Sequence, residues 1–368
     1  MCAGVVLMAL RMPFRYLEPT FFAGLLDDPV LWVRVRPWGR ALLFDCGQLH
    51  HLAKRTLKSL AALFITHAHM DHFMGFDTLV RHVLVSPRVF DVFGPPGLAE
   101  KIEHKLSAYD WNLNERFWCT FRVHEVFSKH IQRWLFPGPQ RFSRQPDGTA
   151  DRVDSIVYSN QWVRVEAQQV DHHIPVLLYR ITEQLTFGLD ADRLTASGLS
   201  GGPWIKQLKR QFYKGLLGKE ALTVRQAQGK RESFHVVTDT RRLYEAIRKN
   251  RVPSSIGYMT DLGYSGKNEA TVADMLQGVT LLVGECAFLA DHVEKARQSC
   301  HLCTQDMNLL LQKIRPAFYL PVHLSKSCGE VSQNLYQELR PPAGTKLIHL
   351  PERLLPRPLL PCEVRLGS

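Results

Sequence analysis

The chain has 368 residues, 45% of them hydrophobic, with a formal net charge of +11 and an isoelectric point near 9.3. This composition allows a large core, and no apolar stretch reaches the roughly 20 residues that cross a bilayer, so no membrane association is expected. The eight cysteines are scattered, and the start lacks the charged segment of a signal peptide, so we expect a cytoplasmic protein without disulfides.

The first hundred residues alternate short apolar runs with turns, which is the pattern of strands with short connections. The run Gly94-Pro-Pro-Gly97 stops the last of these strands, and a helix is expected from 98 to about 109. The expected strands cover residues 30–35, 41–45, 62–65 and 89–93.

A dense set of metal donors follows the third of these strands, in His67-Ala-His69-Met-Asp71-His72. A strand ending here would point His67 and His69 to the same side, and a turn would bring Asp71 and His72 round to them. Three histidines and one carboxylate exceed what one catalytic metal takes from a protein, which indicates two metals. The alternative is a surface loop that happens to be rich in histidine.

The rest of the chain again interleaves strands with helices, which predicts an α/β layered domain. His172 and His173 lead into a strand that runs to Ile181. A hinge-like segment at 197–204 precedes a basic stretch, and a proline-rich tail begins at about 341 and is expected to lie over the surface. The remaining expected elements are strands at 256–261, 280–284 and 318–323 and a helix at 304–314.

Candidate ligands recur at or just beyond the ends of the expected strands. Strand ends along one edge of a sheet are where loops converge on a site, so we expect these side chains to lie together. They are Asp45, His67, His69, His172, Asp261 and His323.

Two further features bear on partners and redox state. Residues 206–251 contain thirteen Lys or Arg against four acids, a net charge of about +9, which is typical of a protein with an anionic partner such as nucleic acid. A solvated basic face is the alternative. Cys300-His-Leu-Cys303 is the one close pair of cysteines. Without a second pair, it is expected to be reduced thiols rather than a metal motif.

With these motifs the chain resembles the metallo-β-lactamase superfamily and, within it, the ribonuclease Z branch that trims the 3′ ends of tRNA precursors. The likeness extends from about Leu42 to Ser325. The motifs that carry it are Leu43-Phe-Asp-Cys-Gly47, His67-Ala-His-Met-Asp-His72, His172-His-Ile-Pro-Val-Leu-Leu-Tyr179, Gly201-Gly-Pro-Trp-Ile-Lys-Gln-Leu-Lys209, and Glu285 with His301 and His323. The resemblance implies a four-layered αββα sandwich as one domain over 1–368, with a basic arm-like insertion at about 197–251.

The resemblance also implies a ligand set for two divalent ions, with zinc favoured and manganese or iron as alternatives. Asp261 bridges the metals in this assignment. Asp239 stays open as the alternative, because in the family the bridging aspartate precedes threonine, as in Asp239-Thr240-Arg241. Asp261 has the more plausible interval, since it lies 24 residues before Glu285, whereas Asp239 lies 46 residues before it. One metal would take His67, His69, His172 and Asp261, and the other Asp71, His72, Asp261 and His323.

Further roles follow from the same resemblance. Asp71 would accept a proton, His301 held by Glu285 would donate one, and Asp45 would orient a ligand histidine. The candidate phosphate contacts are Lys206, Lys209 and Arg210.

The predicted function is that of a metal-dependent phosphodiesterase, a ribonuclease Z-like endonuclease that cleaves the 3′ side of tRNA precursors through a water between the metals. RNA is then the substrate, and a homodimer is typical of this branch. The departures are Gly284, Leu302-Cys303 and Ser327-Cys328, which stand where the branch has histidine, Ser-Thr and Arg-Tyr. These departures leave open the alternative that the chain hydrolyses a small molecule, such as a cyclic nucleotide, lactone or ester. The third reading is an RNA-binding module with an inactive metal site.

Overall fold

The computed structural model describes residues 12–113, 115–228 and 231–354. The chain divides into two compact units, the first formed by the segments up to Glu183 and from Ser254 onward, the second by Gln184–Pro253. The predicted arm at 197–251 falls within the second unit.

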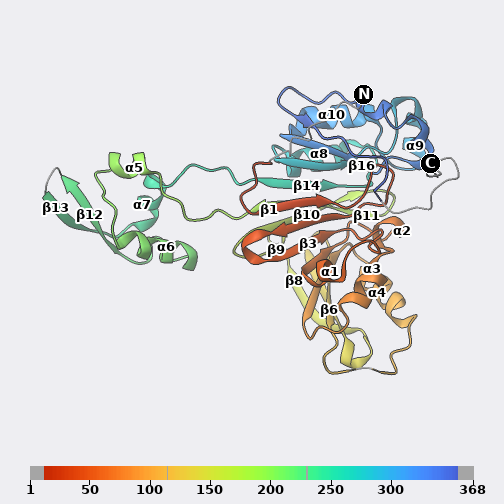
Figure 1. Cartoon of the computed structure of the whole chain (residues 1–368), viewed down its shortest axis with the longest axis horizontal. Coiled ribbons are helices and arrows are strands. Elements are labelled where there is room, and N and C mark those ends of the chain that lie inside the picture. The colour runs from red at the N-terminus through yellow and green to blue at the C-terminus, as the bar shows by residue number, and fades with distance from the viewer. Residues whose placement is uncertain (1–11, 114, 229–230, 355–368) are drawn as a thin grey trace, which may run out of the picture. The chain divides into compact units, whose positions relative to one another are not determined.

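The first unit contains an eight-stranded sheet whose strands follow one another in chain order (Figure 1). Its centre, β3 to β6, is parallel, and antiparallel pairs complete both edges. The strands are β1 (Leu17–Phe21), β2 (Leu31–Val35), β3 (Arg40–Phe44), β4 (Leu60–Phe64), β5 (Val89–Gly94), β6 (Thr120–Val126), β7 (His130–Pro137) and β8 (Gln145–Asp151).

A second, seven-stranded sheet in the same unit has the order β17-β16-β15-β14-β11-β10-β9. The strands β14 to β17 are parallel, and β14 pairs antiparallel with β11. The strands are β9 (Ile156–Ser159), β10 (Val163–Asp171), β11 (Pro175–Glu183), β14 (Ser255–Met259), β15 (Leu281–Glu285), β16 (Phe318–Val322) and β17 (Lys346–Leu347).

The helices of the first unit lie mainly between strands, as the alternating pattern predicts. The α-helices are α1 (Lys54–Lys58), α2 (Met70–Phe73), α3 (Phe76–Val83), α4 (Leu98–Ser107), α8 (Gly266–Leu276), α9 (Val293–Gln298), α10 (Thr304–Ile314) and α11 (Asn334–Glu338). Short 3₁₀ turns are η1 (Arg36–Trp38), η2 (Gly138–Gln140), η3 (Ala290–His292) and η4 (Lys326–Val331).

Three hydrophobic layers hold these elements together. In β3, Leu42 and Phe44 pack between the two sheets, whereas Leu43 faces the core that α3 and α4 cover. In β15, Leu282 likewise faces the core under α8 and α10. Because each strand is buried on both faces, its sequence reads as a continuous apolar run. The layers are helix, sheet, sheet and helix, so the predicted αββα sandwich is confirmed.

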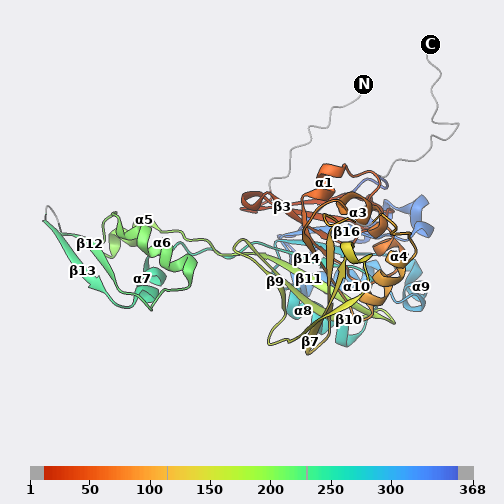
Figure 2. The same cartoon turned by 90° about the horizontal axis from the view of Figure 1, so that it is seen from below.

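The second unit has its own small core. Trp204, Leu208 and Tyr244 are buried together with Val224 and Ile247. Figure 2 shows its helices beside a two-stranded hairpin. The elements are α5 (Ala191–Ala196), α6 (Trp204–Lys214), β12 (Leu222–Gln228), β13 (Arg231–Val237) and α7 (Thr240–Ile247).

The described part of the tail, 341–354, has no buried residue and so lies at the surface, as sequence reasoning expected. It adds β17 to the second sheet, and the carbonyls of Pro351 and Glu352 accept hydrogen bonds from Leu25 and Leu26. Backbone pairing therefore holds this segment in place; residues 355–368 lie outside the described part. Within the described residues, no helix has the length and apolarity to span a membrane.

Candidate metal centre

The predicted ligands come together beyond the carboxyl ends of parallel strands in both sheets. His67 and His69 follow β4, Asp261 follows β14 and His323 follows β16. Sequence reasoning ended this strand at residue 65, close to the end of β4 at Phe64, and used strand alternation to orient His67 and His69. In the structure the loop after β4 and the start of α2 carry the donors. Their convergence depends on the loop and not on strand alternation.

An unusual backbone conformation turns three of these side chains into the site. Asp45, Asp261 and His323 have φ angles of 55°, 49° and 62°, the left-handed region that non-glycine residues rarely occupy. Such residues cost on the order of 1–3 kcal/mol each and cluster at functional sites. Here each one ends a strand and reverses the chain at the sheet edge.

A first donor group consists of His67, His69, His172 and Asp261, whose ligand atoms lie within 4.8 Å of one another. The Nε2 atoms of His67 and His172 lie 3.5 Å and 3.9 Å from Asp261 Oδ2. His69 is exposed, so this side of the group is open to substrate.

A second donor group consists of Asp71, His72, Asp261 and His323, again within 4.8 Å. His72 Nε2 lies 3.3 Å from Asp261 Oδ2, and His323 Nδ1 lies 3.2 Å from Oδ1. Asp261 therefore belongs to both groups and offers each of them a carboxylate oxygen.

Buried polar atoms left without hydrogen bonds show that the residues fit cations. Four such atoms face this volume in the described part of the chain: His67 Nε2, His72 Nε2, Asp261 Oδ1 and His323 Nδ1. An unsatisfied buried polar atom is costly, and each becomes satisfied when it ligates a metal. The donor set of imidazole nitrogen and carboxylate oxygen suits divalent ions such as zinc.

Asp239, the alternative to Asp261, caps a helix in the second unit. Its Oδ1 accepts the backbone N–H of Arg242 at 2.9 Å, and the residue is the N-cap of α7 in the second unit. Among the described residues, both donor groups contain Asp261 and neither contains Asp239. An aspartate before a helix is a common cap, which explains the misleading Asp-Thr-Arg letters.

Asp45 orients the second donor group. It is fully buried, and its Oδ2 lies 2.9 Å from His72 Nδ1. The hydroxyls of Thr66 and Tyr258 donate to the same carboxylate, at 2.8 Å and 2.9 Å. A carboxylate on Nδ1 fixes the ring so that Nε2 points at the metal position. No sequence pattern indicated Thr66 and Tyr258 as partners of Asp45.

A backbone carbonyl orients His172. The Nδ1 atom of His172 lies 2.7 Å from the carbonyl oxygen of Cys300 and donates to it. Its Nε2 atom is thereby left for the first donor group.

The histidines of the cluster differ in their electrostatics, because burial lowers the pKa of His67, whereas for His72 and His323 burial is outweighed and interactions that include the charge of Asp261 raise the pKa. Burial lowers the pKa of His67 to about 2. Burial opposes ionisation of Asp261, but His323 and His72 outweigh it and hold the pKa of that carboxyl well below its usual range. Asp261 is thus ionised at neutral pH, which is the state that binds cations.

Comparisons with known proteins agree with this geometry. A family profile described as "Beta-lactamase superfamily domain" matches residues 40–134. A protein named ribonuclease Z from Deinococcus radiodurans is 28% identical over 310 residues, covering 82% of this chain and 88% of that protein. This chain has the metallo-β-lactamase fold and resembles ribonuclease Z.

Other relatives support the same placement. Ribonuclease Z from Anoxybacillus flavithermus is 24% identical over 82% of both chains. The metallo-β-lactamase fold protein YhfI from Bacillus subtilis superposes with a TM-score of 0.51 at 13% identity, covering 91% of this chain and 97% of that one. The predicted resemblance to this superfamily and to ribonuclease Z is confirmed.

Beside the donor groups, this metallo-β-lactamase-fold protein holds a buried acid–histidine pair. Glu285 Oε2 lies 2.8 Å from His301 Nδ1, while Oε1 accepts the backbone N–H of Leu262 at 2.6 Å. Burial would lower the pKa of His301, but Glu285 outweighs it and raises that pKa to about 9. His301 is therefore an imidazolium at neutral pH.

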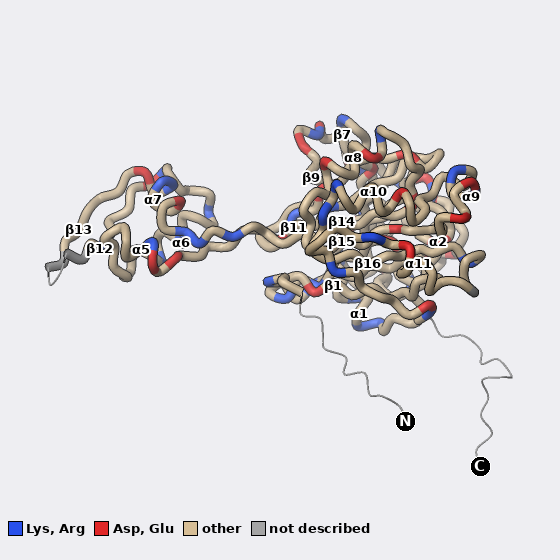
Figure 3. The backbone as a smooth tube through the Cα atoms, turned by 90° about the horizontal axis from the view of Figure 1, so that it is seen from above, with Lys and Arg blue, Asp and Glu red and all other residues tan. Residues whose placement is uncertain are grey.

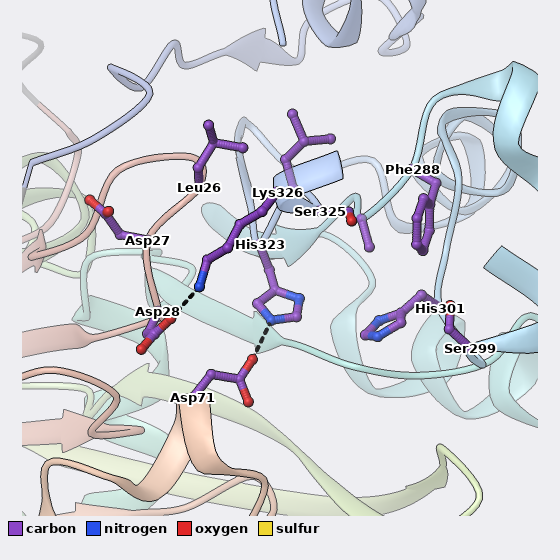
Figure 4. Close-up of a pocket in the computed structure, with 12 residues that line it drawn as sticks. Leu26, Asp27, Asp28, Asp71, Phe288, Ser299, His301, His323, Ser325 and Lys326 are labelled. Carbon is purple, nitrogen blue, oxygen red and sulfur yellow. Dashed lines mark hydrogen bonds and ion pairs between the residues drawn. The ribbon is translucent and has the colours of Figure 1, made fainter. Parts of the chain in front are cut away.

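A pocket of about 310 Å³ lies beside this pair, with His301 in its lining (Figure 4). Asp71, His301 and His323 line it together with Asp28 and Lys326. Lys326 Nζ lies 3.6 Å from Asp28 Oδ1. Sequence reasoning missed both residues. The signal for Lys326 was its place three residues after His323.

The predicted phosphate contacts lie on one helix of the second unit. Lys206, Lys209 and Arg210 are exposed on α6, whose opposite face is buried through Trp204 and Leu208. Figure 3 marks the Lys and Arg positions on α6 and α7. Arg210 pairs with Glu220 at 3.6 Å, an exposed ion pair of little energetic weight. The three cations thus form a solvent-facing positive strip.

Proposed function

We propose that this chain is a metal-dependent phosphodiesterase that acts on RNA, as a ribonuclease Z-like endonuclease at the 3′ side of tRNA precursors. The observation that carries the proposal is the sharing of Asp261 by two donor groups beside the Glu285–His301 pair. Named relatives at 28% and 24% identity support the same reaction.

The first donor group would hold one divalent ion and the second donor group the other, with Asp261 common to both. Zinc is the metal that we favour, since histidine and carboxylate donors suit it, and manganese or iron fit the same set. When bound, such ions supply Lewis acidity, which neutralises phosphate charge and makes water a stronger nucleophile.

Asp71 would accept the proton of the attacking water. It lines the pocket, and its Oδ2 lies 3.0 Å from His323 Nε2. Burial raises the pKa of Asp71, but the hydrogen bond from His323 together with the charges of His72 and His323 outweighs burial. The net shift is downward, so the carboxylate is ionised at neutral pH.

His301 would stabilise and protonate the leaving oxygen. Its ring lines the pocket, and Glu285 holds Nδ1, which leaves Nε2 for the substrate. A positioned imidazolium contributes roughly 10²–10⁴-fold in proton transfer. The fully buried Glu285 keeps this ring charged.

Cations at two places would hold the RNA. Lys326 at the pocket would contact a phosphate near the cut, and the strip of Lys206, Lys209 and Arg210 on α6 would contact phosphates elsewhere. Such contacts give affinity that falls with salt and carries no sequence information.

A hydrolase of a small molecule is the second candidate. The pocket of about 310 Å³ is of a size that small ligands fill. The departures at Leu302-Cys303 and Ser327-Cys328 lie beside its lining residues.

The six described free cysteines are buried and unpaired, which supports a cytoplasmic location. The homodimer predicted from the resemblance stays a prediction, which sedimentation of the full chain checks.

The test is cleavage of a 3′-extended tRNA precursor with added zinc or manganese, beside hydrolysis of bis-(p-nitrophenyl) phosphate. The wild type should perform both reactions, and His69→Ala should lose both. His104→Ala is the matched control, because His104 is exposed on α4 and belongs to no donor group. Hydrolysis of small esters with intact RNA would favour the second candidate.

A further inference from the structure

Three residues around His172 form another group of metal donors, separate from the two groups described above. Asp171, His173 and Cys300 each offer one ligand atom, and these atoms lie within 4.8 Å of one another. None of the three belongs to the first or the second donor group. Together they present an oxygen, a nitrogen and a sulfur.

Buried hydrogen bonds fix the backbone that carries Asp171. The side chain of Asn268, itself buried, donates to the Asp171 carbonyl at 2.8 Å and accepts its N–H at 3.0 Å. Gly263 donates to the same carbonyl at 3.1 Å. The exposed carboxylate of Asp171 therefore projects from a rigid base.

The position of Cys300 is equally determined. Its carbonyl accepts the Nδ1–H of His172 at 2.7 Å, and its side chain is buried. A Cβ at Gly263 would lie 2.5 Å from the Cys300 sulfur. Glycine at 263 thus leaves the room that the thiol occupies.

A small cavity of about 110 Å³ adjoins the group, lined by Asp171, Cys300, Ser265 and Asn268 among others. It has room for water, which would complete the coordination of an ion. The nearby cation Arg297 is engaged by Asp306, at 2.7 Å and 2.6 Å, so its charge is balanced.

We propose that Asp171, His173 and Cys300 bind a further divalent cation of the thiophilic zinc class. Thiolate, imidazole and carboxylate are the donors of zinc sites, and three protein ligands leave a fourth position for water. The soft thiolate selects zinc, cobalt or cadmium over magnesium and manganese. Cys303, the other cysteine of the close pair, takes no part, because its thiol donates a hydrogen bond to Asp306 Oδ2 at 3.2 Å.

Cobalt substitution tests this proposal, because a thiolate bound to Co²⁺ gives a charge-transfer band in the near ultraviolet. The first and second donor groups contain only nitrogen and oxygen donors, so the band reports the Cys300 site alone. The full chain is stripped of metal, titrated with Co²⁺, and its bound metal is counted by mass spectrometry.

The wild type should show the band, and Cys300→Ser should lose it together with one metal equivalent per chain. Cys303→Ser is the matched control and should keep both. This buried cysteine is the N-cap of α10, a position that serine suits. A wild type without the band, or a Cys300→Ser protein with unchanged metal content, would overturn the proposal.

His173→Gly supplies a second variant at an exposed residue, and glycine accommodates the left-handed backbone of this position, where φ is 60°. We expect the band to weaken or shift in this variant, while bis-(p-nitrophenyl) phosphate hydrolysis continues. An unchanged band would remove His173 from the site. The band is expected whether or not the protein cleaves RNA. The proposed metal site and the proposed function can therefore be disproved independently of each other.

Discussion

The strand-end edge of the first unit and the surface of the second unit use charge in opposite ways. At the strand ends, charged groups are buried and each is held by several partners, as Asp45 is held by Thr66, His72 and Tyr258. On α6, the cations Lys206 and Lys209 are exposed. Catalysis requires groups at fixed positions, whereas phosphate binding requires only a local excess of positive charge.

The largest effect is expected from Asp261→Asn, which removes the carboxylate shared by the two donor groups. We expect phosphodiester hydrolysis to fall by at least about 10³-fold, since several kcal/mol of charge stabilisation depend on both cations. Measuring kcat/KM on bis-(p-nitrophenyl) phosphate checks this. Asp239→Asn is the matched control and should retain activity, since Asp239 only caps α7.

Glu285→Gln should lower hydrolysis by about 10²-fold or more, because His301 then loses the charge that keeps it protonated. The pKa of His301 is raised to about 9 by Glu285. Without that carboxylate, the basic limb of the pH–rate profile should move to lower pH. A profile that keeps its basic limb would show that His301 is not the proton donor.

Asp45→Asn should weaken metal binding by about 10–100-fold, because the ring of His72 loses its orienting carboxylate. Titration of the metal-free protein with zinc measures the change. Retained affinity would mean that Thr66 and the remaining packing suffice to orient His72.

On the second unit, Lys206→Gln, Lys209→Gln and Arg210→Gln combined should weaken RNA binding by about 10-fold at moderate salt. The slope of log affinity against log salt should fall by about 2–3, roughly one for each lost phosphate contact. Hydrolysis of bis-(p-nitrophenyl) phosphate should be unchanged, since that substrate has no extended backbone. Equal losses on both substrates would contradict the assignment of hydrolysis to the strand-end site and of RNA binding to the cations on α6.

A separate effect concerns the stability of the metal-free protein against pH. The folded-state pKa of His301, about 9, exceeds its ordinary value of 6.5, so the stabilisation is full below about pH 6.5 and disappears as pH rises through 9. It amounts to on the order of 3 kcal/mol. Urea unfolding of wild type and His301→Gln should differ most at low pH and converge above pH 9.

Much of the site was predictable because its donors cluster in short motifs at strand ends. The strands around His67, Asp261 and His323 are continuous apolar runs, so their ends are visible in the sequence. The same runs predicted an α/β layered domain, whereas the arrangement in four layers came from the resemblance to the metallo-β-lactamase superfamily.

Other features depend on contacts that no local pattern encodes. The Asp28–Lys326 pair joins residues far apart in the chain. The left-handed turn at Asp45 and its bond to Tyr258 likewise become visible only in three dimensions. The hydrogen bonds of the tail to Leu25 and Leu26 were equally invisible, because proline-rich composition says nothing of backbone pairing.

The central claim is that Asp261 serves two cations at once, and anomalous diffraction from zinc-loaded crystals tests it most directly. Crystals of Cys300→Ser keep the proposed additional site from contributing. We predict two anomalous peaks flanking the Asp261 carboxylate, about 3.5–4 Å apart, one beside His67 and the other beside His323. A single peak, or peaks that do not contact Asp261, would contradict the account.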